Sequence, residues 1–152
     1  MKYIRTTCLM ILCVLFSCAH ADETASSTYQ FKGDHFLASY LDCDKAALTD
    51  LKNLHQVMLD AAAASGATVL NFSSWEFPEN GFTMVILLSE SHASIHTYPE
   101  FGACFVDLFT CGENCSAEYF DKVLRAYLKP EVVAEKMFIR SDEIIEKHAL
   151  QK

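Results

Sequence analysis

Apolar positions in residues 31–140 recur in short blocks separated by turn-forming residues. Blocks of this length and composition predict β-strands at 31–41, 67–77, 82–88, 93–97, 103–109 and 132–139. Pro78-Glu79-Asn80-Gly81 is a strong turn signal between the second and third of them. The chain therefore contains enough strands for a sheet with one buried face.

Two longer stretches have helical spacing instead. Asp44 is a plausible N-cap for a helix from Lys45 to about Ser65, with Gly66 as its C-terminal stop. A second amphipathic helix is predicted from its cap at Ser116 to about residue 128, before Pro130. Strands with two amphipathic helices predict an α+β fold, a two-layer α/β sandwich in which the helices cover one face of an antiparallel sheet.

The N-terminus has the pattern of an export signal. Lys2 and Arg5 precede an apolar run too short for a comfortable membrane span, and Ala19-His20-Ala21 fits a cleavage site. We expect a signal peptide at 1–21, a linker at 22–30, one domain at 31–140 and a C-terminal tail at 141–152. Lipoprotein processing at Cys18 is the alternative. The mature chain would be periplasmic or secreted if the leader is used and cytoplasmic otherwise, with no stable membrane span after leader removal.

Charge and cysteine content narrow the range of functions. The 152-residue chain has a net charge of −8, which argues against nucleic acid as its main partner. Four cysteines follow the leader, and none of them has Cys-x-x-Cys zinc spacing. A metal site from His92, His96, Cys111 and Cys115 is conceivable but disfavoured. No metal is therefore expected, whereas a Cys111–Cys115 disulfide is a hypothesis for an oxidising compartment.

One polar stretch interrupts the apolar, strand-forming part of the chain. Glu90-Ser91-His92 and then His96 follow the apolar segment 84–88, and Cys111 comes after a further apolar segment. Polar side chains in such a region need partners or a function. An acid, a hydroxyl, imidazoles and a thiol are the groups used for nucleophilic and acid–base chemistry.

These residues resemble the bacterial and archaeal S-adenosylmethionine decarboxylase proenzymes. The resemblance rests on the run from Glu90 to Glu100, followed by Val106-Asp107-Leu108-Phe109-Thr110-Cys111-Gly112, and it extends over about residues 33–128. Gly33-Asp34-His35 matches a phrase in the family's first strand. The resemblance implies the same sandwich fold and a homodimer of cleaved α/β protomers.

It also implies a self-processing enzyme with a cofactor made from its own backbone. Ser91 would attack the carbonyl of Glu90, the chain would break between them, and Ser91 would become a pyruvoyl group. That group would form a Schiff base with the substrate amine and accept the electrons left by decarboxylation. By family position, His96 is the proton acceptor in processing, Thr83 supports processing, and Cys111 is the proton donor in catalysis.

The expected substrate is S-adenosylmethionine, decarboxylated for spermidine and polyamine biosynthesis. Phe77 and Tyr98 match the aromatic residues that bind the adenine, and Glu100 matches the acid that binds the ribose. The chain departs from the family pattern at Thr83-Met84 and at Trp75-Glu76. Two alternatives stay open here: a pyruvoyl decarboxylase of another amino acid such as arginine or ornithine, and an exported, catalytically idle relative that binds a nucleoside or a partner.

Overall fold

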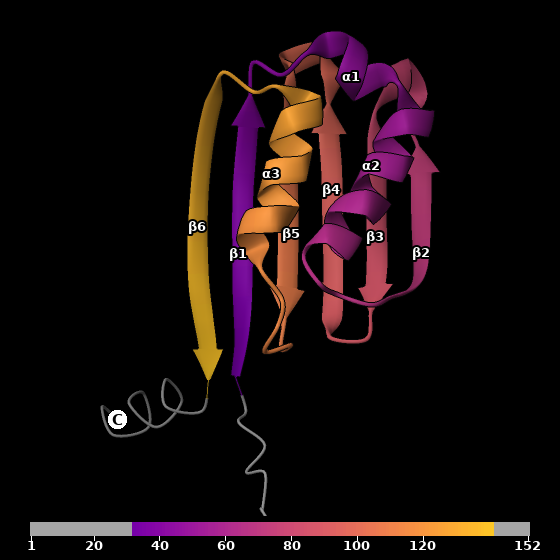
Figure 1. The fold of residues 1–152 in the computed structure, drawn as a ribbon. Helices are drawn as coiled ribbons and strands as arrows, with labels where there is room; N and C mark the ends of the chain where they lie inside the picture. The colour runs from indigo at the N-terminus through magenta and orange to yellow at the C-terminus, as the bar shows by residue number, and fades with distance from the viewer. Residues whose placement is uncertain (1–31, 142–152) are drawn as a thin grey trace, which may run out of the picture.

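A computed structural model describes residues 32–141, which form one antiparallel sheet with helices on one face (Figure 1). This confirms the α+β sandwich. The strands are β1 (Lys32–Leu41), β2 (Val69–Glu76), β3 (Phe82–Leu88), β4 (Ser91–Tyr98), β5 (Ala103–Thr110) and β6 (Val132–Ser141), in the spatial order β2-β3-β4-β5-β1-β6. The predicted leader, linker and tail lie outside the described residues, except that Ser141 is the last residue of β6.

The helices are α1 (Lys45–Thr49), α2 (Leu51–Ala64) and α3 (Ala117–Leu128), with 3-10 turns η1 (Pro78–Asn80) and η2 (Pro99–Phe101). Figure 1 shows α2 and α3 side by side over the sheet. None of the helices within residues 32–141 is long and apolar enough to cross a bilayer.

The prediction of a single helix from Lys45 to Ser65 is wrong, because Asp50 divides it. Asp50 has a non-helical backbone (φ −82°, ψ 75°), and its side chain accepts a hydrogen bond from the Asn53 backbone N–H, so it caps α2. Aspartate favours such local bonds over the helix interior. Asp44 caps α1 as predicted, and Gly66 ends α2 with φ +88°. Ser116 precedes α3 but makes no side-chain capping bond.

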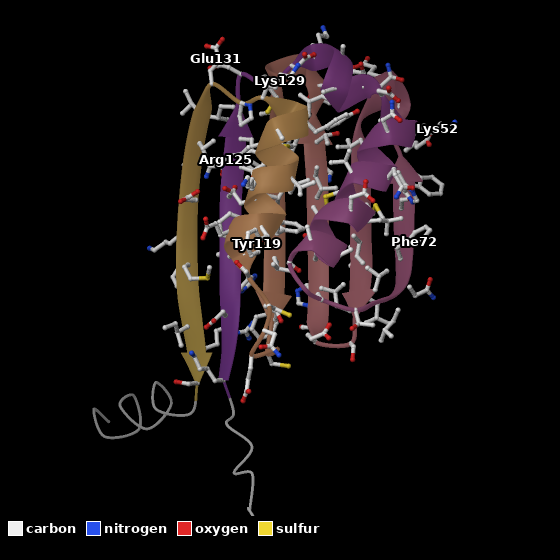
Figure 2. All side chains as sticks on the ribbon, in the orientation of Figure 1. Lys52, Phe72, Tyr119, Arg125, Lys129 and Glu131 are labelled. Atoms are coloured by element: carbon white, nitrogen blue, oxygen red, sulfur yellow. The ribbon has the colours of Figure 1, made fainter. Side chains whose placement is uncertain are left out.

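Strand alternation separates the two faces of the sheet. In β3, Phe82, Met84, Ile86 and Leu88 are buried beneath the helices. Phe72 of β2 also points to the helix side, where its ring meets His55 of α2 edge-on at 4.6 Å (Figure 2). The opposite face, here called the open face, is built from the intervening positions, among them His35, Thr83, Val85, Leu87, His92, His96, Tyr98, Phe105 and Phe109.

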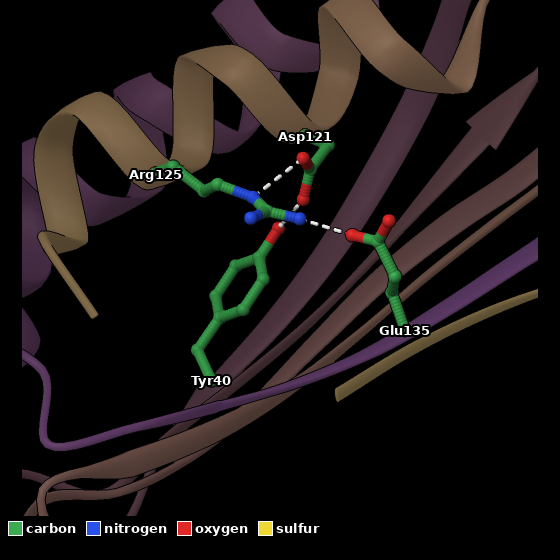
Figure 3. A network of polar contacts seen from close by, with 4 residues as sticks. All are labelled: Tyr40, Asp121, Arg125 and Glu135. Carbon is green, nitrogen blue, oxygen red and sulfur yellow. Dashed lines mark hydrogen bonds and ion pairs between the residues drawn. The ribbon is translucent and has the colours of Figure 1, made fainter. Parts of the chain in front are cut away.

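A polar network ties the edge strand β6 to α3 (Figure 3). The Tyr40 hydroxyl donates to Asp121 at 2.5 Å, and Arg125 forms ion pairs with Asp121 and Glu135 of β6. Burial of the phenol, followed by its hydrogen bond to Asp121, raises the pKa of Tyr40 far above its ordinary value. Most of β6 is exposed, so this network helps to hold the strand that closes one side of the site described next.

Candidate active site

The hairpin between β3 and β4 holds the Glu90–Ser91 peptide bond in a strained conformation. Leu88 pairs with Ser91, so Ser89 and Glu90 form the turn. Ser91 has φ 154°, which L-residues rarely adopt and which costs of the order of 1–3 kcal/mol. The Glu90 carboxylate accepts a bond from the Thr68 backbone N–H at 2.8 Å, and this bond lowers its pKa. The turn is therefore anchored directly before the strained residue.

Cys111, the residue that follows β5, directs two donors at the Glu90 carbonyl oxygen. Its backbone N–H and its thiol each lie 3.1 Å from that oxygen. Gly112 permits this close approach, since a Cβ at that position would lie 2.9 Å from Glu90 Cγ. Two donors on one carbonyl oxygen can stabilise the negative charge that develops when the carbonyl carbon is attacked.

His92 lies beside the Ser91 hydroxyl, with Nδ1 3.1 Å from Oγ. Its ring meets those of Phe109 and His35, at centroid distances of 5.7 and 6.4 Å. Burial lowers the pKa of His35; Asp107 opposes this shift and Arg140 adds to it. The sequence interpretation assigned no role to His92 in processing, although its position directly after Ser91 was a signal that could have suggested one.

A cavity of about 980 Å³ opens beside this constellation. It lies between β1, the hairpin, the end of β5 and β6, and Ser91, Cys111 and His35 are among its lining residues. Arg140 of β6 also lines it, with its guanidinium 4.5 Å from the centre of the Phe109 ring. The volume lies within the range of about 300–1,000 Å³ common for small-molecule sites.

The remaining predicted site residues gather at the other end of β4. The His96 ring contacts Tyr98 at 4.7 Å and Phe77 at 5.8 Å, and Glu100 is exposed in the adjoining turn η2. Thr83 pairs with His96 across the sheet and donates its hydroxyl to the Ile95 carbonyl.

His96 lies five positions after Ser91 on β4, which at roughly 3.3 Å per residue amounts to about 16 Å. The structure thus brings Glu90, Ser91 and Cys111 together. Within this single chain, it does not bring His96 or Thr83 to Ser91.

The described residues hold four cysteines, and all four are free thiols. A Cys111–Cys115 disulfide therefore stays a prediction for an oxidising compartment. Within residues 32–141, no group of three or more His, Cys, Asp or Glu side chains is placed to hold a metal ion.

Comparison with known proteins places this geometry in a family. The model of the S-adenosylmethionine decarboxylase family matches residues 34–141. The chain belongs to this family. The S-adenosylmethionine decarboxylase proenzyme of Thermosipho africanus is 41% identical over 101 residues, which cover 66% of this chain and 78% of the relative. The proenzyme of Thermotoga petrophila is 40% identical over 116 residues, covering 74% and 88%.

The fold agrees with a solved structure of the same family. The adenosylmethionine decarboxylase of Aquifex aeolicus matches with a TM-score of 0.68 and 28% identity, covering 74% of this chain and 92% of that chain. The resemblance carried by the Glu90–Glu100 run and the Cys111 segment is thus confirmed for the family. Family membership also favours S-adenosylmethionine over arginine or ornithine, the alternative left open by the sequence.

Proposed function

We propose that this S-adenosylmethionine decarboxylase is a proenzyme that cleaves itself between Glu90 and Ser91. The observation that carries the proposal is the Glu90 carbonyl, held by two donors of Cys111 beside the strained Ser91. The enzyme is pyruvoyl-dependent and decarboxylates S-adenosylmethionine for polyamine biosynthesis. Ser91 is the residue we assign as the source of the pyruvoyl group.

The site fits the formation of that group. The strain at Ser91 is relieved when the peptide bond rearranges, and the Cys111 N–H and thiol are placed to hold the Glu90 oxygen as it becomes negative. The pyruvoyl carbonyl supplies an electron sink for decarboxylation. We assign Cys111 Sγ, which lies against the Glu90 carbonyl next to Ser91, as the acid that returns a proton to the substrate α-carbon.

The distance between Ser91 and His96 favours a homodimer. His96 and Thr83 lie on the open face, where Val85 and Leu87 are 49% and 53% exposed. Large apolar side chains exposed together indicate a contact surface. If two open faces pack about a two-fold axis that crosses the strands, the His96 end of one copy faces the Ser91 end of the other.

Such a dimer unites the predicted residues that one chain leaves apart. His96 then takes the Ser91 α-proton in processing, with Thr83 in support, and Phe77, Tyr98 and Glu100 bind the nucleoside beside the other copy's Ser91. The aromatic contacts around His96 support this assignment, because exposed rings suit a planar, cationic substrate.

Intact mass and denaturing gels test the cleavage. The purified chain should give two fragments that meet at Glu90 and Ser91, and the C-terminal one should be lighter by one ammonia than a fragment that begins with serine. Ser91→Ala should stay in one piece. A wild-type chain that remains full-length after prolonged incubation contradicts the proposal.

A further inference from the structure

The base that starts the cleavage is absent from the roles assigned so far. Ser91 must lose its hydroxyl proton as it attacks, and a hydroxyl is a weak nucleophile without a base. His96 lies about 16 Å along the strand from Ser91 and is assigned to the later removal of the α-proton. The Glu90 carboxylate is engaged by Thr68, and the Cys111 thiol donates to the Glu90 carbonyl.

His92 is positioned to act as the base for the Ser91 hydroxyl. Among residues 32–141, it is the side chain that hydrogen-bonds Ser91 Oγ, at 3.1 Å, within the range of about 2.6–3.2 Å expected for proton transfer. In the tautomer with its proton on Nε2, His92 Nδ1 accepts the hydroxyl proton. The nucleophile, its base and the oxyanion donors thus meet at one peptide bond.

The surroundings of His92 hold its ring in place. Phe109 and His35 contact it from the strands β5 and β1, and it pairs with Leu87 of β3 on the other side. His35 and His92 are both half-buried, so rotation of either ring is restricted by its neighbours. A ring held this way keeps Nδ1 directed at Ser91 while the turn rearranges.

We propose that His92 is the general base for the first step of self-cleavage, in which the Glu90–Ser91 peptide becomes an ester; the inference rests on the proposed cleavage at this bond. His92 Nδ1 takes the proton of Ser91 Oγ as Oγ bonds to the Glu90 carbonyl carbon. The carbonyl oxygen becomes an oxyanion bonded to the Cys111 donors.

The protonated His92 then returns the proton to the Ser91 nitrogen, the C–N bond breaks, and the carbonyl re-forms as an ester with a free Ser91 amine. No electrons are gained or lost, so this step needs no partner molecule.

The experiment follows cleavage of freshly synthesised full-length precursor, made in a cell-free system, over time. His92→Ala and His92→Gln should form fragments about 10²–10⁴-fold more slowly than wild type. Added imidazole should partly restore His92→Ala, because it can enter the cavity beside Ser91. His55→Gln is the matched control and should cleave at the wild-type rate, because His55 lies on α2 against Phe72, on the helix side of the sheet. Thermal melting checks that each variant is folded.

Ester trapping locates the step. His96→Ala should accumulate the ester, which hydroxylamine cuts between Glu90 and Ser91. The double variant His92→Ala/His96→Ala should yield little hydroxylamine-sensitive product. If it accumulates the ester as fast as His96→Ala, or if folded His92→Gln cleaves as fast as wild type, the role of His92 is refuted. Failure of the wild-type chain to cleave would instead overturn the proposed function itself.

Discussion

The two ends of β4 have different chemistry, although they belong to one strand of eight residues. At the Ser91 end, Cys111 donates to the Glu90 carbonyl and His92 contacts the Ser91 hydroxyl, on either side of a strained peptide bond. At the His96 end, aromatic rings meet edge-on and are partly exposed. Breaking a peptide bond needs directed donors and a base, whereas holding a flat nucleoside needs exposed rings. Because a strand is rigid and extended, one copy cannot bring its own two ends together.

The largest expected effect comes from putting the intact Ser91 end and the intact His96 end of β4 on two different chains. Ser91→Ala and His96→Ala should each be inactive alone, since each lacks one end of every site. Co-expressed in equal amounts, they should give mixed dimers with one complete site, roughly a quarter of the wild-type number of sites. Activity and fragment formation in the co-purified mixture measure this. If activity does not recover although mixed dimers are confirmed, the proposed pairing of opposite ends is contradicted.

A smaller effect is expected from removing the Cys111 thiol at the Ser91 end. Cys111→Ala keeps the backbone N–H that points to the Glu90 carbonyl, so cleavage should continue at a reduced rate. Decarboxylation by the cleaved protein should fall about 10²–10⁴-fold, because the acid for the substrate carbon is lost. Radiolabelled CO₂ release measures this, with Cys115→Ala as control. Equal CO₂ release per cleaved site would remove Cys111 from catalysis.

Substitutions of the aromatic residues beside His96 should change substrate binding and leave self-cleavage largely intact. Phe77→Leu or Tyr98→Leu should raise KM about 2–30-fold, which corresponds to the loss of roughly 0.5–2 kcal/mol of ring contact. Phe72→Leu is the control, since this ring lies on the helix side of the same sheet (Figure 2). A KM unchanged in both site variants would show that the aromatic cluster serves packing rather than recognition.

The smallest expected effect concerns the wall of the cavity. Arg125→Met removes both ion pairs of the network that ties β6 to α3 (Figure 3). Because the side chains of Arg125 and Glu135 are 38% and 52% exposed, solvent screens the pair and the loss of stability should be about 1 kcal/mol or less. Urea unfolding measures it. Because β6 lines the cavity, Arg125→Met should raise the KM more than a matched surface substitution such as Lys52→Met does. Equal KM values for the two variants would show that the network does not shape the site.

Local patterns in the sequence predicted most of the fold. Short apolar blocks between turn signals located all six strands to within a few residues, and Asp44 and Gly66 marked helix ends, because these signals depend only on neighbouring residues. The break at Asp50 was missed: the apolar stripe continues across it, and only the local backbone shows that the side chain caps a new helix.

The candidate site was only partly predictable for a different reason. The Glu90-Ser91 pair, Cys111 and the aromatic residues were found because they match positions of the family that the chain resembles. The contact of Cys111 with the Glu90 carbonyl joins residues 21 positions apart, and it exists because β5 pairs with β4 in one register. His92 and His96 lie on the same strand as Ser91, and the extended backbone of β4 keeps His92 beside Ser91 and puts His96 at the far end. The sequence determines which residue types the site can use. The distances between them depend on strand pairing and turn geometry, which are set only when the chain folds.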